Sequence, residues 1–225
     1  MDGKRVLEVK REVLSGNDRA ADAFRSRLRG EGTFFVDVMA SPGAGKTTLL
    51  LALIPELQRL GVERTGVIEA DLESDVDALK IKRAGIDSVE LNTRGTCHVE
   101  MGMVERAWAA FGGRRFDALF LENIGNLVCP AEFDTGAHCR IMLLSVPEGW
   151  DKVMKYPPMF AAVEALVVTK SDYLPLNPDF DMERLKDRAR VLNPGLEIFV
   201  TSARTGEGIG ELAAWMAQRR ACELA

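Results

Sequence analysis

The chain has 225 residues, of which 47% are hydrophobic and 28% charged, an ordinary composition for a soluble globular protein. Its formal net charge of −5 argues against a general nucleic-acid binder, which would carry a basic excess. No apolar run approaches the ~20 residues that span a bilayer, and the N-terminal residues lack the apolar core of a secretory signal. Four cysteines in such a chain indicate reduced thiols, so we expect a cytoplasmic protein with no nucleic-acid or membrane partner.

The first part of the chain is charged and carries apolar positions at helical spacing between residues 4 and 29. This pattern predicts one or two peripheral helices, and residues 1–32 are therefore expected to form a helical extension. Residues 33–225 are expected to form one α/β domain, because no linker, repeat or low-complexity tract interrupts them.

Short apolar runs alternate with helical patterns along the rest of the chain. The helical patterns include residues 49–60, 99–111 and 208–220, and the strand-like runs are 34–39, 65–70, 88–91, 118–121, 141–146, 165–169 and 196–200. Strands that are apolar throughout are typical of a sheet buried on both faces. The alternation predicts a three-layer α/β fold in which helices flank a mostly parallel central sheet.

The most specific motif is Ala40-Ser-Pro-Gly-Ala-Gly-Lys-Thr-Thr48, which lies between an expected strand and an expected helix. In that context the motif predicts a P-loop, whose glycines let backbone N–H groups approach the phosphates of a nucleotide. Lys46 is expected to reach the β- and γ-phosphates, and the Thr47 hydroxyl is expected to bind Mg²⁺. A glycine-rich turn that binds no phosphate is the alternative. The expected phosphate-binding residues are Gly43, Ala44, Gly45, Lys46, Thr47 and Thr48.

Two later segments favour guanine as the base and thus a P-loop G domain over residues 33–225. Thr169-Lys-Ser-Asp172 resembles the guanine-reading Asn-Lys-x-Asp element, and Thr201-Ser-Ala-Arg204 resembles the Ser-Ala-Lys loop that covers the base. A carboxylate can accept hydrogen bonds from the ring N–H and the exocyclic amine of guanine, which adenine does not offer. Thr169 replaces the usual Asn, which leaves one hydrogen bond to the base in question. The expected base-binding residues are Lys170, Asp172, Ser202 and Ala203.

Acidic residues at two strand ends are candidates for magnesium and for the attacking water. Glu122 ends an apolar strand and is expected in the magnesium shell, while the N–H group of nearby Gly125 is expected to sense the γ-phosphate. Asp71 and Asp77 are further candidates for the magnesium shell or for orienting water, although a solvated loop or a helix N-terminus would also explain carboxylates there. Lys46, Asp71 and Glu122 are the expected catalytic residues.

Cysteine and histidine side chains indicate a second kind of site. Cys97 directly precedes His98, one of only two histidines, and Cys129 follows the expected γ-phosphate sensor. Thiolate and imidazole ligands suit nickel, zinc and related metals. Buried, purely structural cysteines are the alternative explanation. Three ligands fall short of a closed tetrahedral site, so a second subunit or solvent would have to complete the coordination.

Four of these segments together resemble the HypB family of SIMIBI-class GTPases, which are related to UreG and are needed to insert nickel into [NiFe]-hydrogenase. The resemblance covers roughly residues 34–215, and its most specific string is Glu-Asn-Ile-Gly-Asn-Leu-Val-Cys-Pro. The matching segments are residues 41–50, 95–98, 122–130 and 148–157.

The resemblance implies a slow, switch-type GTPase that dimerises in the GTP state and binds nickel or zinc at the dimer interface. It further implies a HypA-type metallochaperone and the hydrogenase large-subunit precursor as partners. The family's metal ligands correspond to Cys97, His98 and Cys129, and its first-switch acidic positions to Asp71 and Asp77. Residues expected to be structural or incidental are His138, Cys139 and Cys222.

Three other functions remain open at this point. An accessory GTPase for urease or for another nickel or cobalt enzyme would share the same motifs. A P-loop small-molecule kinase would need an arginine-rich lid, for which Arg184, Arg188 and Arg190 are candidates, although surface charge on a helix explains them as well. A metal-binding scaffold without turnover would explain Ala40 and Thr169 as departures from the strict nucleotide motifs.

Overall fold

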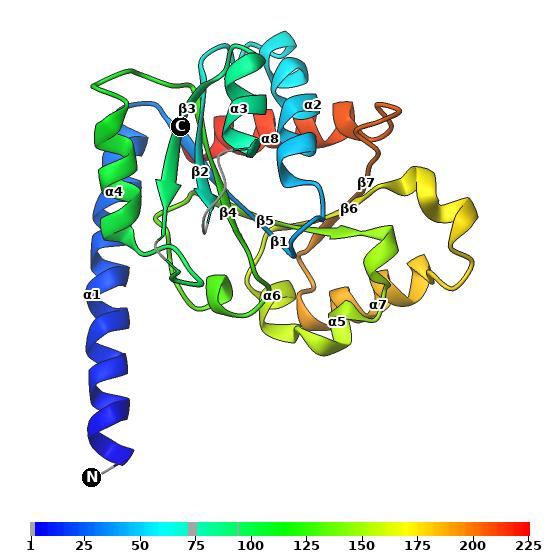
Figure 1. Ribbon diagram of the computed structural model, residues 1–225, viewed down its shortest axis with the longest axis horizontal. Helices are drawn as coiled ribbons and strands as arrows, with labels where there is room; N and C mark the ends of the chain where they lie inside the picture. Colours follow the sequence, from blue (N-terminus) through cyan, green and yellow to red (C-terminus); the bar gives the residue numbers. More distant parts are fainter. Residues whose placement is uncertain (1–2, 72–75, 94) are drawn as a thin grey trace.

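The computed structural model describes residues 3–71, 76–93 and 95–225 and contains one seven-stranded parallel sheet with helices on both faces (Figure 1). The strand order is β3-β2-β4-β1-β5-β6-β7. All seven expected strands form, and every strand pair is parallel. Their bounds are β1 Phe34–Ala40, β2 Thr65–Asp71, β3 Asp87–Asn92, β4 Ala118–Gly125, β5 Cys139–Ser145, β6 Ala165–Thr169 and β7 Glu197–Val200.

The helices connect these strands and begin or end close to the expected positions. The N-terminal pattern forms one continuous helix of 28 residues. Within the described ranges, none of the helices has both the length and the apolar character needed to cross a bilayer. The α-helices are α1 Gly3–Gly30, α2 Lys46–Arg59, α3 Val76–Arg83, α4 Met101–Ala110, α5 Lys152–Lys155, α6 Pro157–Ala161, α7 Met182–Leu192 and α8 Ile209–Glu223, and the 3₁₀ turns are η1 Cys129–Ala131, η2 Val146–Glu148 and η3 Ser171–Leu176.

The fifth strand differs from the expected residues 141–146 at both ends. It begins at Cys139, where β1 provides a pairing partner, and it ends at Ser145. Val146 starts the 3₁₀ turn η2, because Pro147 cannot donate a hydrogen bond to a neighbouring strand. The Glu148 carboxylate also accepts hydrogen bonds from the backbone N–H and the hydroxyl of Ser145, at 2.9 and 2.7 Å. These contacts close the turn.

Alternate side chains of the strands face opposite layers, as the two-residue period of a strand requires. Phe34, Val36 and Val38 of β1 pack with α2 and α8 in one core cluster. Phe35 packs with α1 and α4 on the opposite face, and Met39 packs there with the helices that follow β5 and β6. Both faces are thus apolar, which explains why the strands read as continuous hydrophobic runs.

The long helix α1 is attached to the sheet by its C-terminal part. Ala21, Phe24 and Leu28 are buried at helical spacing against Phe35. Figure 1 shows the N-terminal part of α1 extending past the edge of the sheet. The division into a helical extension at residues 1–32 and a G domain at 33–225 stays a prediction.

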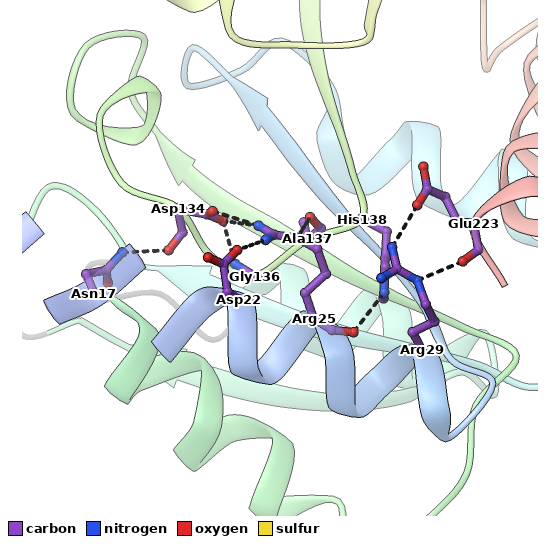
Figure 2. A network of polar contacts seen from close by, with 9 residues as sticks. All are labelled: Asn17, Asp22, Arg25, Arg29, Asp134, Gly136, Ala137, His138 and Glu223. Carbon is purple, nitrogen blue, oxygen red and sulfur yellow. Dashed lines mark hydrogen bonds and ion pairs between the residues drawn. The ribbon is translucent and has the colours of Figure 1, made fainter. Parts of the chain in front are cut away.

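A polar network connects α1 to the start of β5 and to α8 (Figure 2). Arg29 donates to the Glu223 carboxylate at 3.1 Å and to its backbone carbonyl at 2.9 Å. His138 accepts from the Phe35 N–H through Nδ1 at 3.0 Å, while its Nε2 lies 3.1 Å from the carbonyl of Arg25. This pair of contacts requires a neutral ring with the proton on Nε2. Both ring nitrogens of His138 are therefore in contact with backbone groups of the fold, and Cys139 beside it is fully buried.

We predict that His138 makes the fold less stable in mild acid. Burial lowers the pKa of His138, so below about pH 6.5 the unfolded chain binds a proton that the folded chain does not. The free energy of unfolding should therefore fall by up to about 1 kcal/mol between about pH 7.5 and pH 5.5. Urea titrations of the wild type and His138→Asn measure this, since Asn keeps an acceptor for the Phe35 N–H.

His98→Asn, which removes the other histidine, is measured in parallel so that the effect of His138 is separated from that of His98. Equal pH dependence in His138→Asn and the wild type would contradict the assignment.

Candidate functional site

The P-loop lies between β1 and α2 and has the backbone that its glycines allow. Gly43 and Gly45 have φ angles of +75° and +99°, in the left-handed region that favours glycine. Gly45 is the N-cap of α2, and Lys46 is the first residue of that helix. The N–H groups of the first helical turn and the positive end of the helix dipole therefore meet at this loop, an arrangement that favours anions.

A buried hydrogen bond connects the P-loop helix to the neighbouring strand β4. The Thr47 hydroxyl donates to the Glu122 carboxylate at 2.8 Å, and each residue is 7% exposed. A hydroxyl and a carboxylate at this spacing are oxygen ligands of the type that Mg²⁺ prefers. Asp71 ends β2 at the same edge of the sheet. Asp77 falls in α3, and its side chain lies outside the described part of the structure.

Gly125 ends β4 in close contact with the P-loop. A Cβ atom at Gly125 would lie 2.8 Å from Cγ of Pro42 and 2.9 Å from its backbone nitrogen. Atoms of that kind do not approach so closely, so only glycine fits without movement of the loop. The pairing of the strands also brings Gly125 to the start of the P-loop, since Gly125 pairs with Ala40 after a shift in the register of β1 and β4.

Thr169 contacts the P-loop directly, a role that sequence reasoning did not find. Its hydroxyl donates to the carbonyl of Ala44 at 2.7 Å, and Lys170 Nζ donates to the carbonyl of Gly43 at 2.8 Å. Lys170 has a left-handed backbone, with φ of +59°, which directs the chain across the loop. Thr169, at the position of the usual Asn, thus connects this segment to the P-loop.

A cavity of about 240 Å³ opens beside the P-loop where a base would lie. At its rim the Asp172 carboxylate accepts from the Ser202 hydroxyl at 2.7 Å and lies 3.5 Å from the Arg204 guanidinium. These contacts hold the carboxylate in one orientation and leave it able to accept further hydrogen bonds. The lining residues are Ala44, Gly45, Thr48, Leu49, Pro147, Thr169, Lys170, Asp172, Tyr173, Thr201, Ser202, Ala203 and Arg204.

The two cysteines expected as metal ligands lie in contact. Cys97 Sγ is 3.0 Å from Cys129 Sγ, and this shared hydrogen bond raises the pKa of Cys97. Asn126 Nδ2 donates to the backbone carbonyl of Cys97 at 3.0 Å, which joins the two loops beside the thiols. The structure thus brings together donors that are 32 residues apart in the sequence.

His98 lies next to the thiols with one ring nitrogen toward Cys97 and the other toward Glu100. Its Nδ1 is 3.9 Å from Cys97 Sγ, and its Nε2 is 3.1 Å from the Glu100 carboxylate. The ring stacks on Phe133 with centroids 3.7 Å apart. Among the residues that the structure describes, no group of three or more potential ligands is arranged to hold a metal. Coordination by His98 therefore stays a prediction, and Nδ1 is the ring nitrogen on the side of the thiols.

A buried carboxylate supports the segment between the two sites. Asp37 of β1 is fully buried and accepts from Asn123 Nδ2 at 3.0 Å and from the Thr135 hydroxyl at 2.8 Å. Burial raises the pKa of Asp37, because a charged carboxylate loses its hydration there. A single acidic residue inside the apolar run of residues 34–39 is the signal that could have marked this position.

Two of the arginines considered for a kinase lid line a different groove. Arg184 lies 5.7 Å over the Trp150 ring and pairs with Asp181 at 3.1 Å. Arg184 and Arg188 line this groove with Met154, and none of its lining residues belongs to the base cavity. Their positions are explained by packing between α5 and α7.

Comparison with known proteins identifies the family. The family model for the CobW/HypB/UreG nucleotide-binding domain matches residues 35–200. The hydrogenase maturation factor HypB of Azotobacter chroococcum mcd 1 is 42% identical over 221 residues, covering 98% of this chain and 71% of that protein. The crystal structure of HypB from Helicobacter pylori in complex with nickel has a TM-score of 0.86 and 32% identity, covering 93% of this chain and 97% of that one. HypB from Archaeoglobus fulgidus has a TM-score of 0.81 and 32% identity, covering 92% of this chain and 100% of that one. This chain therefore belongs to the CobW/HypB/UreG family of nucleotide-binding proteins, in its HypB branch.

Proposed function

We propose that this chain is a GTP-hydrolysing carrier that delivers nickel during [NiFe]-hydrogenase maturation, the process for which its HypB relatives are named. The observation that carries the proposal is one short segment that contacts both sites. It begins at Glu122, hydrogen-bonded to Thr47 of the P-loop helix, and it ends at Cys129, in contact with Cys97. Loss of the γ-phosphate would therefore move the start of this segment, and the movement would reach the thiol of Cys129 over a few residues.

GTP is the proposed nucleotide because the base cavity presents an oriented carboxylate. Asp172 can accept the ring N–H and the exocyclic amine of guanine, while Ser202 and Arg204 hold it in place. The phosphates would extend to the N-terminus of α2, where Lys46 begins the helix.

Magnesium fits the oxygen ligands at the end of β4. Thr47 and Glu122 would hold the ion directly or through water, with Asp71 and Asp77 as further candidates. The bound ion supplies charge that stabilises the transferring phosphoryl group. Lys46 would position the β- and γ-phosphates, and the N–H group of Gly125 would detect the γ-phosphate.

Nickel is the proposed cargo, and zinc is a competitor because both metals accept thiolate and imidazole ligands. Cys97 and Cys129 would supply the thiolates, and His98 would supply Nδ1 of its imidazole while Nε2 keeps its contact with Glu100. Since one chain offers an incomplete ligand set, a second copy is expected to complete the site in a GTP-favoured homodimer. A HypA-type metallochaperone and the hydrogenase large-subunit precursor are the expected partners.

We predict that Gly125→Ala slows GTP hydrolysis. The new Cβ would displace Pro42 and separate the end of β4 from the P-loop, as the 2.8 Å approach requires. We expect phosphate release at saturating GTP to fall at least about tenfold, because small displacements of positioning groups cost large factors in rate. Gly210→Ala is the matched control, since nothing lies within 4 Å of a Cβ there. Unchanged hydrolysis in Gly125→Ala would remove this segment from the nucleotide mechanism.

We predict that Asp172→Asn exchanges the base preference. The amide cannot accept both guanine donors, so GTP affinity should fall about 100-fold through the loss of charge-assisted hydrogen bonds. Affinity for xanthosine triphosphate should rise, because its base carries an oxygen where guanine carries the amine. Fluorescent-nucleotide competition measures both constants. Asp179→Asn, at an exposed position nearby, should behave as the wild type, and unaltered selectivity in Asp172→Asn would refute guanine reading by this residue.

We predict that Cys129→Ala abolishes nucleotide-dependent nickel binding and leaves GTP hydrolysis near the wild-type rate. The thiol lies at the far end of the segment from Glu122, so its removal deletes a metal donor without altering the P-loop. Nickel and zinc titrations with GDP and with a non-hydrolysable GTP analogue, together with mass in solution, measure the effect.

The control for this variant is Cys222→Ala, which removes an exposed thiol elsewhere. The wild type is expected to bind about one metal per dimer more tightly with the analogue than with GDP. Nickel binding by Cys129→Ala at the wild-type level would disprove the proposed site.

A further inference from the structure

The two cysteines lie on separate loops that meet at the carboxyl edge of the sheet. The Cys97 loop is residues 93–100, between β3 and α4, of which residue 94 lies outside the described part. The Cys129 loop is residues 126–138, between β4 and β5. Near the thiols the loops contact each other through Asn126 and through the stacking of His98 on Phe133.

At the α1 side of these loops, a single side chain spans the gap between them. Asn17 Nδ2 donates to the carbonyl of Asp134 in the Cys129 loop at 2.8 Å, and Asn17 Oδ1 accepts from the N–H of Met101 at 3.0 Å (the first of these contacts is drawn in Figure 2). Met101 is the first residue of α4 and directly follows the Cys97 loop. The side chain of Asn17 therefore connects the Cys129 loop, through its donor, to the residue that follows the Cys97 loop, through its acceptor.

The contact with Met101 fills a gap at the start of α4. The N–H groups in the first turn of a helix have no partner within the helix, and Glu100 at the N-cap makes no side-chain capping bond. Asn17 supplies the acceptor from another helix. Its position consequently fixes where α4 begins and where the Cys97 loop ends.

The helix that carries Asn17 is a fixed support for the Cys129 loop. Arg25 of α1 contacts the two Asp134 carboxylate oxygens at 2.7 and 2.6 Å and donates through Nε to the carbonyl of Ala137 at 2.9 Å. Phe24 and Leu28 bury this part of α1 in the core. Figure 2 shows Asn17 and Arg25 reaching from the same helix toward residues 134–137.

We infer that Asn17 is a positioning residue that sets the distance between Cys97 and Cys129. This inference rests on the proposed function, because it assigns those thiols to a metal site. Loss of the Asn17 contacts removes the connection between the start of α4 and the Cys129 loop and leaves the contacts of Asn126 and Phe133 in place, so the thiols spend less time within reach of one ion. The two hydrogen bonds are only partly buried, so each is expected at the weaker end of the usual range, and together they correspond to about a five- to tenfold change in the population of the closed pair.

The test uses a fluorogenic dibromide whose fluorescence appears after two neighbouring thiols have each displaced one bromide. Two C–S bonds form, two bromide ions leave, and no oxidant is required. We expect bridging of Cys97 and Cys129 to be about five- to tenfold slower in Asn17→Ala than in the wild type. Nickel binding in the presence of the GTP analogue should weaken by a similar factor. Cys129→Ser gives the background signal.

Two further variants separate positioning from general destabilisation. Asp18→Ala removes an exposed neighbour on the same helix and should match the wild type in both assays. Asn17→Asp is isosteric, keeps the acceptor for Met101 and places a carboxylate oxygen against the Asp134 carbonyl, so it should also slow bridging; a urea titration checks that each variant is folded. Wild-type bridging rates in folded Asn17→Ala and Asn17→Asp would overturn the inference. A wild type that binds no nickel would refute the proposed function and leave the bridging result to decide the role of Asn17.

Discussion

The adjacency of β1 and β4 is the constraint on which the rest of this structure depends. Parallel strands end at the same edge of a sheet, so the P-loop after β1 and the segment after β4 begin side by side. The Thr47–Glu122 hydrogen bond at 2.8 Å and the approach of Gly125 to Pro42 then remove the free space between them. Because interiors are close-packed, an ion or phosphate that displaces one of these groups must also displace the chain that continues toward Cys129.

Asp37 is the second support of this arrangement. Burying a carboxylate is unfavourable unless donors surround it, and here the donors come from Asn123 on β4 and Thr135 on the Cys129 loop. The carboxylate is thus a point on β1 to which residues on both sides of Cys129 in the sequence are attached. A displacement of β4 that broke one of these bonds would leave a buried acceptor unsatisfied. The network therefore holds this part of the chain in the position that the structure shows.

Local patterns explain how much of the fold and the site could be predicted. Apolar runs marked all seven strands and the motifs marked the P-loop and the base-reading segments, because each depends on residues adjacent in sequence. Contacts between residues far apart in the sequence left no recognisable pattern in it. The bond from Thr169 to Ala44 and the contacts of Asn17 join residues 125, 117 and 84 positions apart, and the ring of His98 is directed by Phe133 and Glu100. These depend on packing that a linear motif does not contain.

An incomplete metal site is consistent with a carrier. A closed site with four ligands in one chain would hold its ion through folding itself, and release would then require unfolding. Here two thiols and one imidazole nitrogen lie close together, so a set of four ligands needs at least one more from outside the chain. Assembly in one nucleotide state would supply them, and loss of that state would withdraw them. Linkage makes this reciprocal, so the bound ion must stabilise the assembled, nucleotide-loaded form by the same factor. Under the proposed function, release of metal and release of the partner subunit would then be one event, timed by the hydrolysis of GTP.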